Sequence, residues 1–261
     1  MKTLLINAYR DLRARMDQHI EAICLQAGII RYGDHFVYGG ILNRDSVVID
    51  LGTNKGHFAD LIAKSYQSRL FLVDANFALL NTLNIPNSTR VHAAITASEG
   101  EMTFYISANS EASSLDRNMA VQYDIIEERS VQCIPFSKLL TANNIAKVDL
   151  LKVDIEGAEL DMFHSMSDED ILKSKQLAVE FHDFMMPGTL ADVESVAARL
   201  VKLGYVQFKF TPLDWRRILF VHKDVLEVPD SFLRDIRRAL RRSVMLDSFY
   251  YGTLRLLRGG K

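Results

Sequence analysis

Residues 47–58 read VVIDLGTNKGHF, and this stretch joins an apolar run to a turn with two glycines. We predict a buried strand that leads through the turn into a helix, which is where open α/β sheets bind their ligands. Gly52 and Gly56 lack a Cβ, so the backbone can turn sharply and approach a bound molecule. Asp50 is expected to hold a cationic amino group, directly or through water, and Asn54 to bind a carboxylate or order the turn.

The glycine spacing separates two kinds of cofactor. A dinucleotide fingerprint would place glycines at positions 52, 54 and 57, whereas this sequence has Gly52, Asn54 and His57. The turn therefore fits a pyrophosphate poorly. It suits a cofactor that presents an amino acid end and no phosphate, as S-adenosylmethionine does, and a purely structural turn is the alternative.

The ends of the next two predicted strands add to this site. Asp74 closes the run FLVD about 20 positions beyond the turn, where an acidic residue accepts hydrogen bonds from ribose hydroxyls. This pairing is compatible with a nicotinamide cofactor as well as with S-adenosylmethionine. The third strand ends at Ala93 and Ala94, whose small side chains would leave room for an adenine ring.

Apolar runs and helical patterns alternate along the chain, which predicts a parallel sheet with helices on both faces. Tyr205 follows the last of these helices and begins a terminal hairpin, so the final strand is predicted to be antiparallel. We expect strands over 47–50, 70–74, 90–94, 148–154, 177–181, 205–210 and 217–222, and helices over 56–65, 75–84, 136–143, 157–164 and 190–203. The fold class is thus α/β, with a mostly parallel seven-stranded sheet and an antiparallel terminal strand.

Several segments lie outside this alternation of strands and helices. Residues 101–107 alternate in polarity and predict a strand, one half of a small flanking hairpin, and residues 108–118 predict a loop. Four glycines lie within residues 28–40, and we expect a loop there. A turn with Pro212 is expected to join the last two strands.

Composition and charge limit the class of protein. The chain has 261 residues, of which 48% are hydrophobic and 25% charged, as expected for one globular domain with extensions. Its net charge of -2 gives no reason to expect nucleic acid as a partner. Cys24 and Cys133 lie far apart in apolar settings, so both are expected to be small core residues in a reducing compartment. No apolar run approaches the roughly 18 residues that span a bilayer, and a cytoplasmic protein is expected.

Two terminal extensions flank the predicted domain. Residues 1–45 form an N-terminal extension with an amphipathic helix over about 5–27, and residues 46–224 form the catalytic domain. Residues 225–261 form a basic amphipathic extension that suits an anionic membrane surface or a partner. The alternative is a solvated helix packed on the domain. Its arginines are Arg234, Arg237, Arg238, Arg241 and Arg242. A homo-oligomer of the chain is a separate expectation.

A second strand-to-helix junction carries a family resemblance. Residues 148–159 read VDLLKVDIEGAE, and together with the Asp-x-Gly-x-Asn-x-Gly turn they resemble the FkbM family of methyltransferases over about residues 47–182. The resemblance implies a Rossmann-like class I domain that binds S-adenosylmethionine and methylates hydroxyls of sugars, glycolipids or secondary metabolites. This sequence has Asp74-Ala75-Asn76 where the family more often has Glu-Pro-Asn, and the shorter carboxylate still reaches a ribose.

The same junction supplies candidates for catalysis. An alcohol has a high pKa, so its methylation needs a base or a metal to remove the proton. Asp154, at the end of the central strand, is predicted to act as base, orienting group or metal ligand. Lys152 is the second catalytic candidate. If the strand continued, Glu156 would lie on the same face as Lys152 and Asp154. A turn that begins at Asp154 would redirect it.

The next strand brings further groups to the same rim. His182 is the best general-base candidate by its ordinary pKa, and capping a loop is its alternative role. Glu180 and Glu156 are expected to contact the acceptor, as is Ser113 in the loop after the hairpin. A divalent metal site of Asp154, Glu180 and His182 is chemically conceivable, although no spacing rule supports it.

Two other functions compete with O-methylation of a small-molecule, glycan or glycolipid acceptor. The first is an NAD-dependent oxidoreductase, with which Asp74 is compatible but the substituted glycine and the terminal hairpin are not. The second is a non-catalytic binding module on the methyltransferase fold. A nucleic-acid methyltransferase is disfavoured, because the sequence lacks the Asn/Asp-Pro-Pro-aromatic segment typical of that class.

Overall fold

The computed structural model describes residues 2–186, 188–211 and 214–257. Met1, residues 258–261 of the predicted extensions and Pro212 of the predicted turn lie outside these ranges. The helices are α1 Lys2–Gln26, α2 His57–Tyr66, α3 Phe77–Thr82, α4 Arg117–Ala120, α5 Phe136–Ala142, α6 Glu159–Ser165, α7 Asp168–Leu172, α8 Leu190–Lys202 and α9 Asp230–Leu257, with short 3-10 turns η1 Gly39–Ile41, η2 Ser110–Ala112 and η3 Val121–Tyr123. The strands are β1 Ile29–Tyr32, β2 His35–Tyr38, β3 Val47–Leu51, β4 Arg69–Asp74, β5 Ser88–His92, β6 Ala94–Ile95, β7 Gly100–Ser107, β8 Ile125–Ile134, β9 Leu150–Val153, β10 Gln176–Val179, β11 Tyr205–Lys209 and β12 Ile218–His222.

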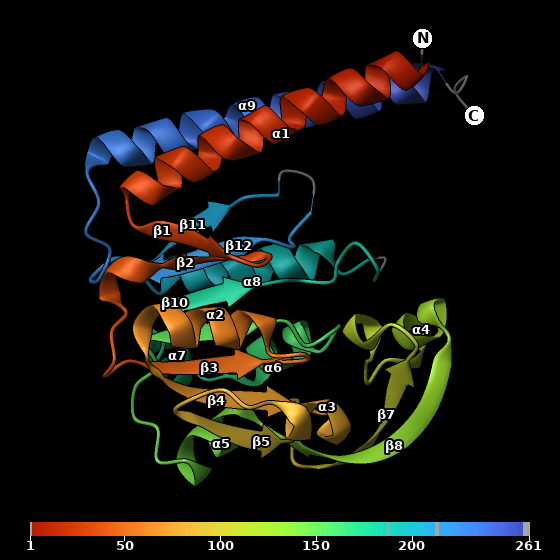
Figure 1. Ribbon diagram of the computed structural model, residues 1–261, viewed down its shortest axis with the longest axis vertical. Helices are drawn as coiled ribbons and strands as arrows, with labels where there is room; N and C mark the ends of the chain where they lie inside the picture. Colours follow the sequence, from red (N-terminus) through yellow and green to blue (C-terminus); the bar gives the residue numbers. More distant parts are fainter. Residues whose placement is uncertain (1, 187, 212–213, 258–261) are drawn as a thin grey trace.

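The central sheet has seven strands in the order β11-β12-β10-β9-β3-β4-β5 (Figure 1). Strands β10, β9, β3, β4 and β5 are parallel neighbours, and β12 pairs antiparallel with both β10 and β11. This confirms the predicted α/β fold, in which a mostly parallel seven-stranded sheet has an antiparallel last strand. The edge itself is formed by β11, because β12 inserts between β11 and β10.

Helices cover both faces of the sheet, as predicted. On one face, apolar residues of α5, α6, α7 and α8 pack on alternate strand residues such as Ile49 and Leu177. On the other face, α2 and α3 pack on Val48 and Leu72. The half of that second face over β12 and β11 is covered by the β1–β2 hairpin, α1 and α9. Asp50 follows Val48 by two residues in β3, so its side chain lies on the second face.

The prediction of a loop over residues 28–40 is wrong, because β1 and β2 form an antiparallel hairpin there. The Gln176 side chain attaches this hairpin to the sheet: its Oε1 accepts from the Tyr38 N–H at 2.8 Å, and its Nε2 donates to the Tyr38 carbonyl at 3.0 Å. The sequence carried the signal for the hairpin, since Gly33-Asp34 separates two runs of apolar and β-branched residues. The hairpin matters because it brings His35 over the carboxyl ends of the strands.

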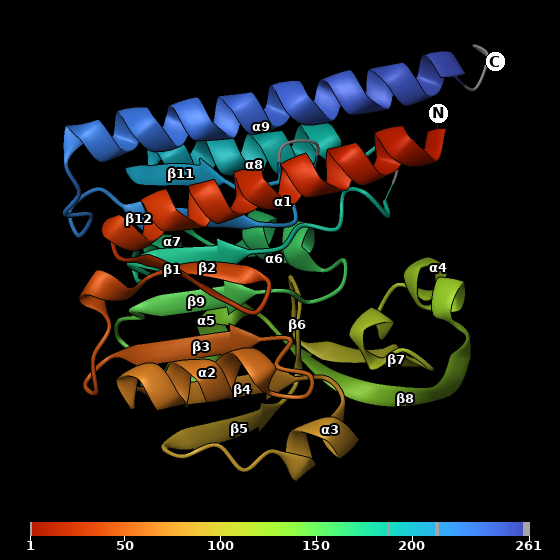
Figure 2. The same cartoon turned by 45° about the horizontal axis from the view of Figure 1, so that its top comes forward.

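The two long terminal helices lie side by side along the sheet edge (Figure 2). The Tyr9 hydroxyl of α1 donates to Asp247 of α9 at 2.9 Å, and the rings of Tyr9 and Tyr250 stack with centroids 3.6 Å apart. Both predicted terminal helices are therefore confirmed, and they pack on each other and on the hairpin. Among the described residues, no helix has the length and apolar character needed to cross a membrane.

A small sheet of β6, β8 and β7 projects from the carboxyl ends of the central strands (Figure 2). Its strand β7 confirms the prediction for residues 101–107, and its partner β8 was not predicted. The predicted strand over 90–94 is corrected: β5 ends at His92, and Ala94 begins β6 of the small sheet. Cys24 and Cys133 are both free and buried, as predicted.

Candidate active site

A cavity of about 420 Å³ lies at the carboxyl ends of β3, β4, β9 and β10. This volume is in the range of small-molecule and cofactor sites. The cavity brings together most of the residues predicted from the sequence. Those that line it are Gly52, Asn54, Asp74, Ala93, Ala94, Ser113, Lys152, Asp154, Glu156 and Glu180.

The carboxylate of Asp74 organises the glycine turn. Its Oδ2 accepts the backbone N–H of Asn54 at 2.6 Å, and its Oδ1 accepts the backbone N–H of Asn76 at 2.7 Å. Burial raises the pKa of Asp74, although these hydrogen bonds and the charge of Lys152 oppose the shift. Each oxygen keeps a free lone pair, so Asp74 can still accept hydrogen bonds from a ligand.

The turn offers a close backbone approach and unsatisfied polar atoms. Gly52 has φ +74, a conformation that a side chain rarely adopts, and Asn54 has φ 48. The Asn54 Oδ1 and the Ser110 Oγ are buried and have no hydrogen-bond partner within the described chain. These residues therefore fit a ligand with polar groups at one end, which the amino acid end of S-adenosylmethionine provides.

Gly56 and Asp50 do not line the cavity. Gly56 caps α2 with φ +74, and a Cβ there would lie 3.0 Å from Leu83 and Ile85, so its lack of a side chain permits close packing. Asp50 is fully buried and pairs with Lys152 Nζ at 3.1 Å. Asp50 therefore does not reach the cavity directly, and its buried charge instead pairs with Lys152. The predicted contact through water stays a prediction.

Lys152 links Asp50 to Asp154. Its Nζ lies 3.4 Å from Asp154 Oδ2 and donates to the carbonyl of Gly52 at 2.7 Å. Burial lowers the pKa of Lys152, but the charges of Asp50 and Asp154 raise it more, so the net direction is upward. Burial likewise raises the pKa of Asp154, but Lys152 and the neighbouring histidines bring it well below its usual range. Lys152 therefore stays charged and holds Asp154 ionised.

His182 lies behind the cavity wall and is buried between carboxylates. Its Nδ1 is 2.9 Å from Glu159 Oε1, and its Nε2 is 3.1 Å from Glu156 Oε2. Burial lowers the pKa of His182, but Glu159 and Glu156 raise it more, to about 12. A charged, doubly paired imidazole cannot accept a proton, so the structure argues against His182 as general base and for its alternative role as a structural partner.

Glu156 is redirected by a left-handed turn, with φ 51. Its carbonyl accepts a hydrogen bond from the Ser114 Oγ at 2.6 Å, which connects the junction to the loop after β7. Ser113, the predicted substrate contact, lines the cavity but accepts the backbone N–H of Ser107 at 3.1 Å through its Oγ. Ser114 therefore attaches the loop to the junction after β9, and the Ser113 hydroxyl binds the end of β7.

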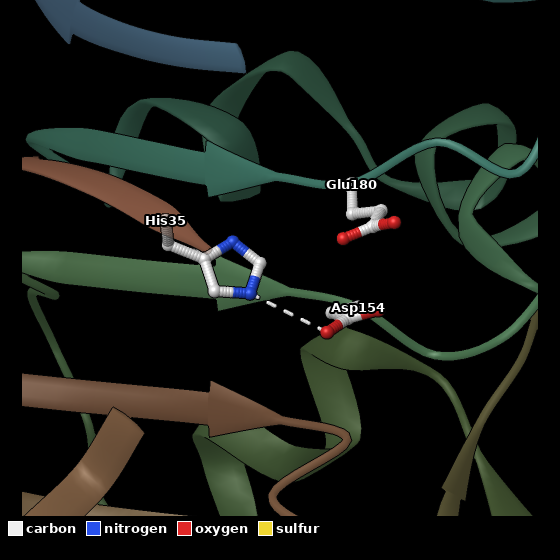
Figure 3. A group of neighbouring side chains, drawn as sticks. All are labelled: His35, Asp154 and Glu180. Carbon is white, nitrogen blue, oxygen red and sulfur yellow. Dashed lines mark ion pairs between the residues drawn. The ribbon is translucent and has the colours of Figure 1, made fainter. Parts of the chain in front are cut away.

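His35 is the main residue of this site that the sequence did not reveal. It is buried in β2, with its Nε2 3.4 Å from Asp154 Oδ2 (Figure 3). Glu180, from the segment after β10, points toward the same space (Figure 3). Burial and the negative charge of Asp154 raise the pKa of Glu180 to about 8.

A second cavity of about 340 Å³ adjoins the first beneath α1 and α9. The two cavities share Asp34 and Glu180 as lining residues. The other side chains of the second cavity are almost all polar or charged: Tyr9, Arg13, Asp17, Thr211, Asp214, Arg216, Arg217, Asp247 and Tyr251. The glycine-turn cavity and the polar cavity are thus neighbours that share Asp34 and Glu180 in their walls.

Comparison with known proteins agrees with this geometry. Residues 50–207 match the family model described as Methyltransferase FkbM domain, and no curated protein matches the sequence significantly. Among solved structures, the precorrin-6y C5,15-methyltransferase from Geobacter metallireducens GS-15 is similar, with 13% identity, a TM-score of 0.36 and coverage of 69% of this chain and 81% of that one. So weak a structural similarity carries no argument. The family model covers more than half of the sequence and includes both motifs of the site, so the chain belongs to the FkbM methyltransferase family.

Proposed function

We propose that this methyltransferase takes its methyl group from S-adenosylmethionine and transfers it to a hydroxyl of a sugar, glycolipid or secondary metabolite. One observation carries the proposal. A single cavity contains the glycine turn of β3 and Asp74 of β4 on one side, and Asp154 and Glu180 of the adjacent strands on the other. The glycine turn with Asp74 and a set of carboxylates therefore line one cavity at the carboxyl ends of the strands.

The residues on the cofactor side match the parts of S-adenosylmethionine. Gly52 and Asn54 would hold the amino acid end, because both line the cavity and Asn54 Oδ1 lacks a partner in the described structure. Asp74 would accept hydrogen bonds from the ribose hydroxyls. Ala93 and Ala94 line the same cavity and leave space for the adenine ring.

The carboxylates on the opposite side suit an acceptor that must lose a proton. Bound in this cavity, S-adenosylmethionine supplies a methyl group activated by its sulfonium charge. The protein's contribution is then to align the acceptor, exclude water and manage the hydroxyl proton. Asp154 is kept ionised by Lys152, and Glu180 has a pKa of about 8. Both carboxylates line the side where the acceptor oxygen would lie.

The second cavity supports a polar acceptor. Its tyrosines, arginines and aspartates can donate and accept hydrogen bonds to several hydroxyls at once. Glu180 lines both cavities, so an acceptor bound in the second cavity would lie next to the cavity that contains Asp154. This lining favours a hydroxyl-rich molecule over an apolar one, and the family assignment favours methyl transfer over an NAD-dependent oxidoreductase.

A turnover assay tests the proposal. The protein is incubated with S-adenosylmethionine and a panel of sugars, glycolipids and hydroxylated metabolites, and the S-adenosylhomocysteine formed is measured. We expect acceptor-dependent turnover that Asp154→Asn abolishes while S-adenosylhomocysteine still binds. Intact turnover in Asp154→Asn would remove this carboxylate from the mechanism. Cofactor binding without turnover on any acceptor would support the non-catalytic binding module.

A further inference from the structure

Three side chains from separate strands converge on one point of the cavity (Figure 3). They are His35 from β2, Asp154 after β9 and Glu180 after β10. One ligand atom from each lies within 4.8 Å of the other two, and the His35 Nε2 is 3.4 Å from the Asp154 Oδ2. Two atoms bound to one cation at about 2.0–2.2 Å lie about 3.0–3.5 Å apart, so the His35–Asp154 distance already suits a shared ion.

The charges around this point are unbalanced. Lys152 is shared between the carboxylates of Asp50 and Asp154, and His182 is held between Glu156 and Glu159. In the described part of the chain, the Glu180 carboxylate has no hydrogen bond or ion pair, and only its backbone N–H is engaged, with the carbonyl of Val153. The residue is half-buried and lines the cavity. The oxygens of Glu180 are therefore available to a cation.

We propose that a divalent cation such as Mn²⁺ or Zn²⁺ binds between the His35 Nε2 and the carboxylates of Asp154 and Glu180. A set of one imidazole and two carboxylates suits first-row divalent metals, whereas carboxylates and carbonyls alone suit Mg²⁺ and Ca²⁺. Asp154 also belongs to an overlapping group with Glu156 and His182. The two ring nitrogens of His182 face Glu156 and Glu159, whereas His35 Nε2 faces Asp154, a carboxylate of the proposed site itself, so His35 is the better imidazole ligand.

The site is open on the side of the cavity. All three residues line the 420 Å³ cavity, and Glu180 also lines the adjoining polar cavity. The remaining coordination positions would thus face the space proposed for the acceptor. A cation there would orient a hydroxyl oxygen and lower its pKa. This role rests on the proposed methyl transfer, whereas binding of the cation does not.

A Mn²⁺ titration of the full chain tests the site. The protein is treated with EDTA, dialysed and titrated with MnCl₂, and free Mn²⁺ is followed by electron paramagnetic resonance. We expect one Mn²⁺ per chain, and binding at least ten-fold weaker in His35→Gln and in Glu180→Gln. The matched control is His222→Gln, because His222 also lies beside a carboxylate, 3.6 Å from Asp224, but far from the cavity on β12. The Mn²⁺ affinity of His222→Gln should equal that of the wild type.

A second measurement needs no variant. In the wild-type chain, bound Mn²⁺ should broaden the NMR signals of the His35 ring protons at substoichiometric metal and leave those of His222 sharp. Absence of stoichiometric Mn²⁺ binding, or equal binding by the wild type and both site variants, would overturn the cation site. S-adenosylhomocysteine binding, measured on the same metal-free protein, separates this outcome from failure of the proposed function.

Discussion

Gly52 faces the main-chain carbonyl of Asp154 so closely that a Cβ at position 52 would lie 1.7 Å from that oxygen. The contact joins the turn after β3 to the junction after β9, and Lys152 reinforces it by donating to the carbonyl of Gly52. The glycine turn and Asp154, the principal candidate for catalysis, are therefore in direct contact. A larger residue at position 52 is expected to displace Asp154.

The Gly52→Ala variant is predicted to lose stability and cofactor binding together. The added methyl collides with backbone, which cannot rotate away, and the φ of +74 is unfavourable for alanine. We expect the free energy of unfolding, measured by urea denaturation, to be lower by about 2 kcal/mol or more. Gly100→Ala is the control, because nothing lies within 4 Å of its Cβ position. Equal stability of the two variants would contradict the close contact.

The Asp74→Asn variant is predicted to weaken S-adenosylhomocysteine binding. The amide removes one of the two acceptor oxygens that hold Asn54 and Asn76, and it leaves ribose hydroxyls without their full partners. We expect a loss of about 1.5–3 kcal/mol in a calorimetric titration. Asp60→Asn, an exposed carboxylate paired with Lys64 on α2, should bind like the wild type. Unchanged affinity in Asp74→Asn would exclude Asp74 from the ribose site.

The Lys152→Met variant is predicted to destabilise the fold because it leaves Asp50 as an unpaired, fully buried charge. Removing one partner of a buried ion pair costs about 3–5 kcal/mol. The double variant Asp50→Asn/Lys152→Met, which removes the orphaned charge as well, should recover much of this loss. Urea denaturation of the wild type and both variants measures the effect. A double variant no more stable than Lys152→Met would show that Lys152 acts mainly through other contacts.

The central sheet could be predicted because its strands are short apolar runs that end in chemically distinctive residues. The glycine turn, Asp74 and Asp154 follow directly from this pattern, since the carboxyl ends of parallel strands meet at one edge. His35 could not be found in the same way, because its place in the site depends on Gln176 binding the backbone of Tyr38, far along the chain. The ion pairs of His182 with Glu156 and Glu159 also depend on the fold and not on sequence spacing. The ordinary pKa of histidine therefore gave the wrong role, that of general base.

We also propose that α9 contacts an anionic membrane surface. Met245 and Phe249 on this helix are 71% and 70% exposed. Its exposed residues also include five arginines, Arg234, Arg237, Arg238, Arg241 and Arg242. Such a combination suits an interfacial helix. We expect co-sedimentation with anionic phosphatidylserine vesicles but not with neutral phosphatidylcholine vesicles, and loss of binding in Arg237→Glu/Arg241→Glu. Failure to co-sediment with either kind of vesicle would support the alternative of a solvated helix.

The most direct test of the central claim is a calorimetric titration of the purified chain with S-adenosylhomocysteine, with NAD as the comparison ligand. The proposed function predicts saturable binding of S-adenosylhomocysteine with one site per chain and no binding of NAD. Binding of NAD, or of neither ligand, would contradict the claim that the cavity beside Gly52 and Asp74 is an S-adenosylmethionine site.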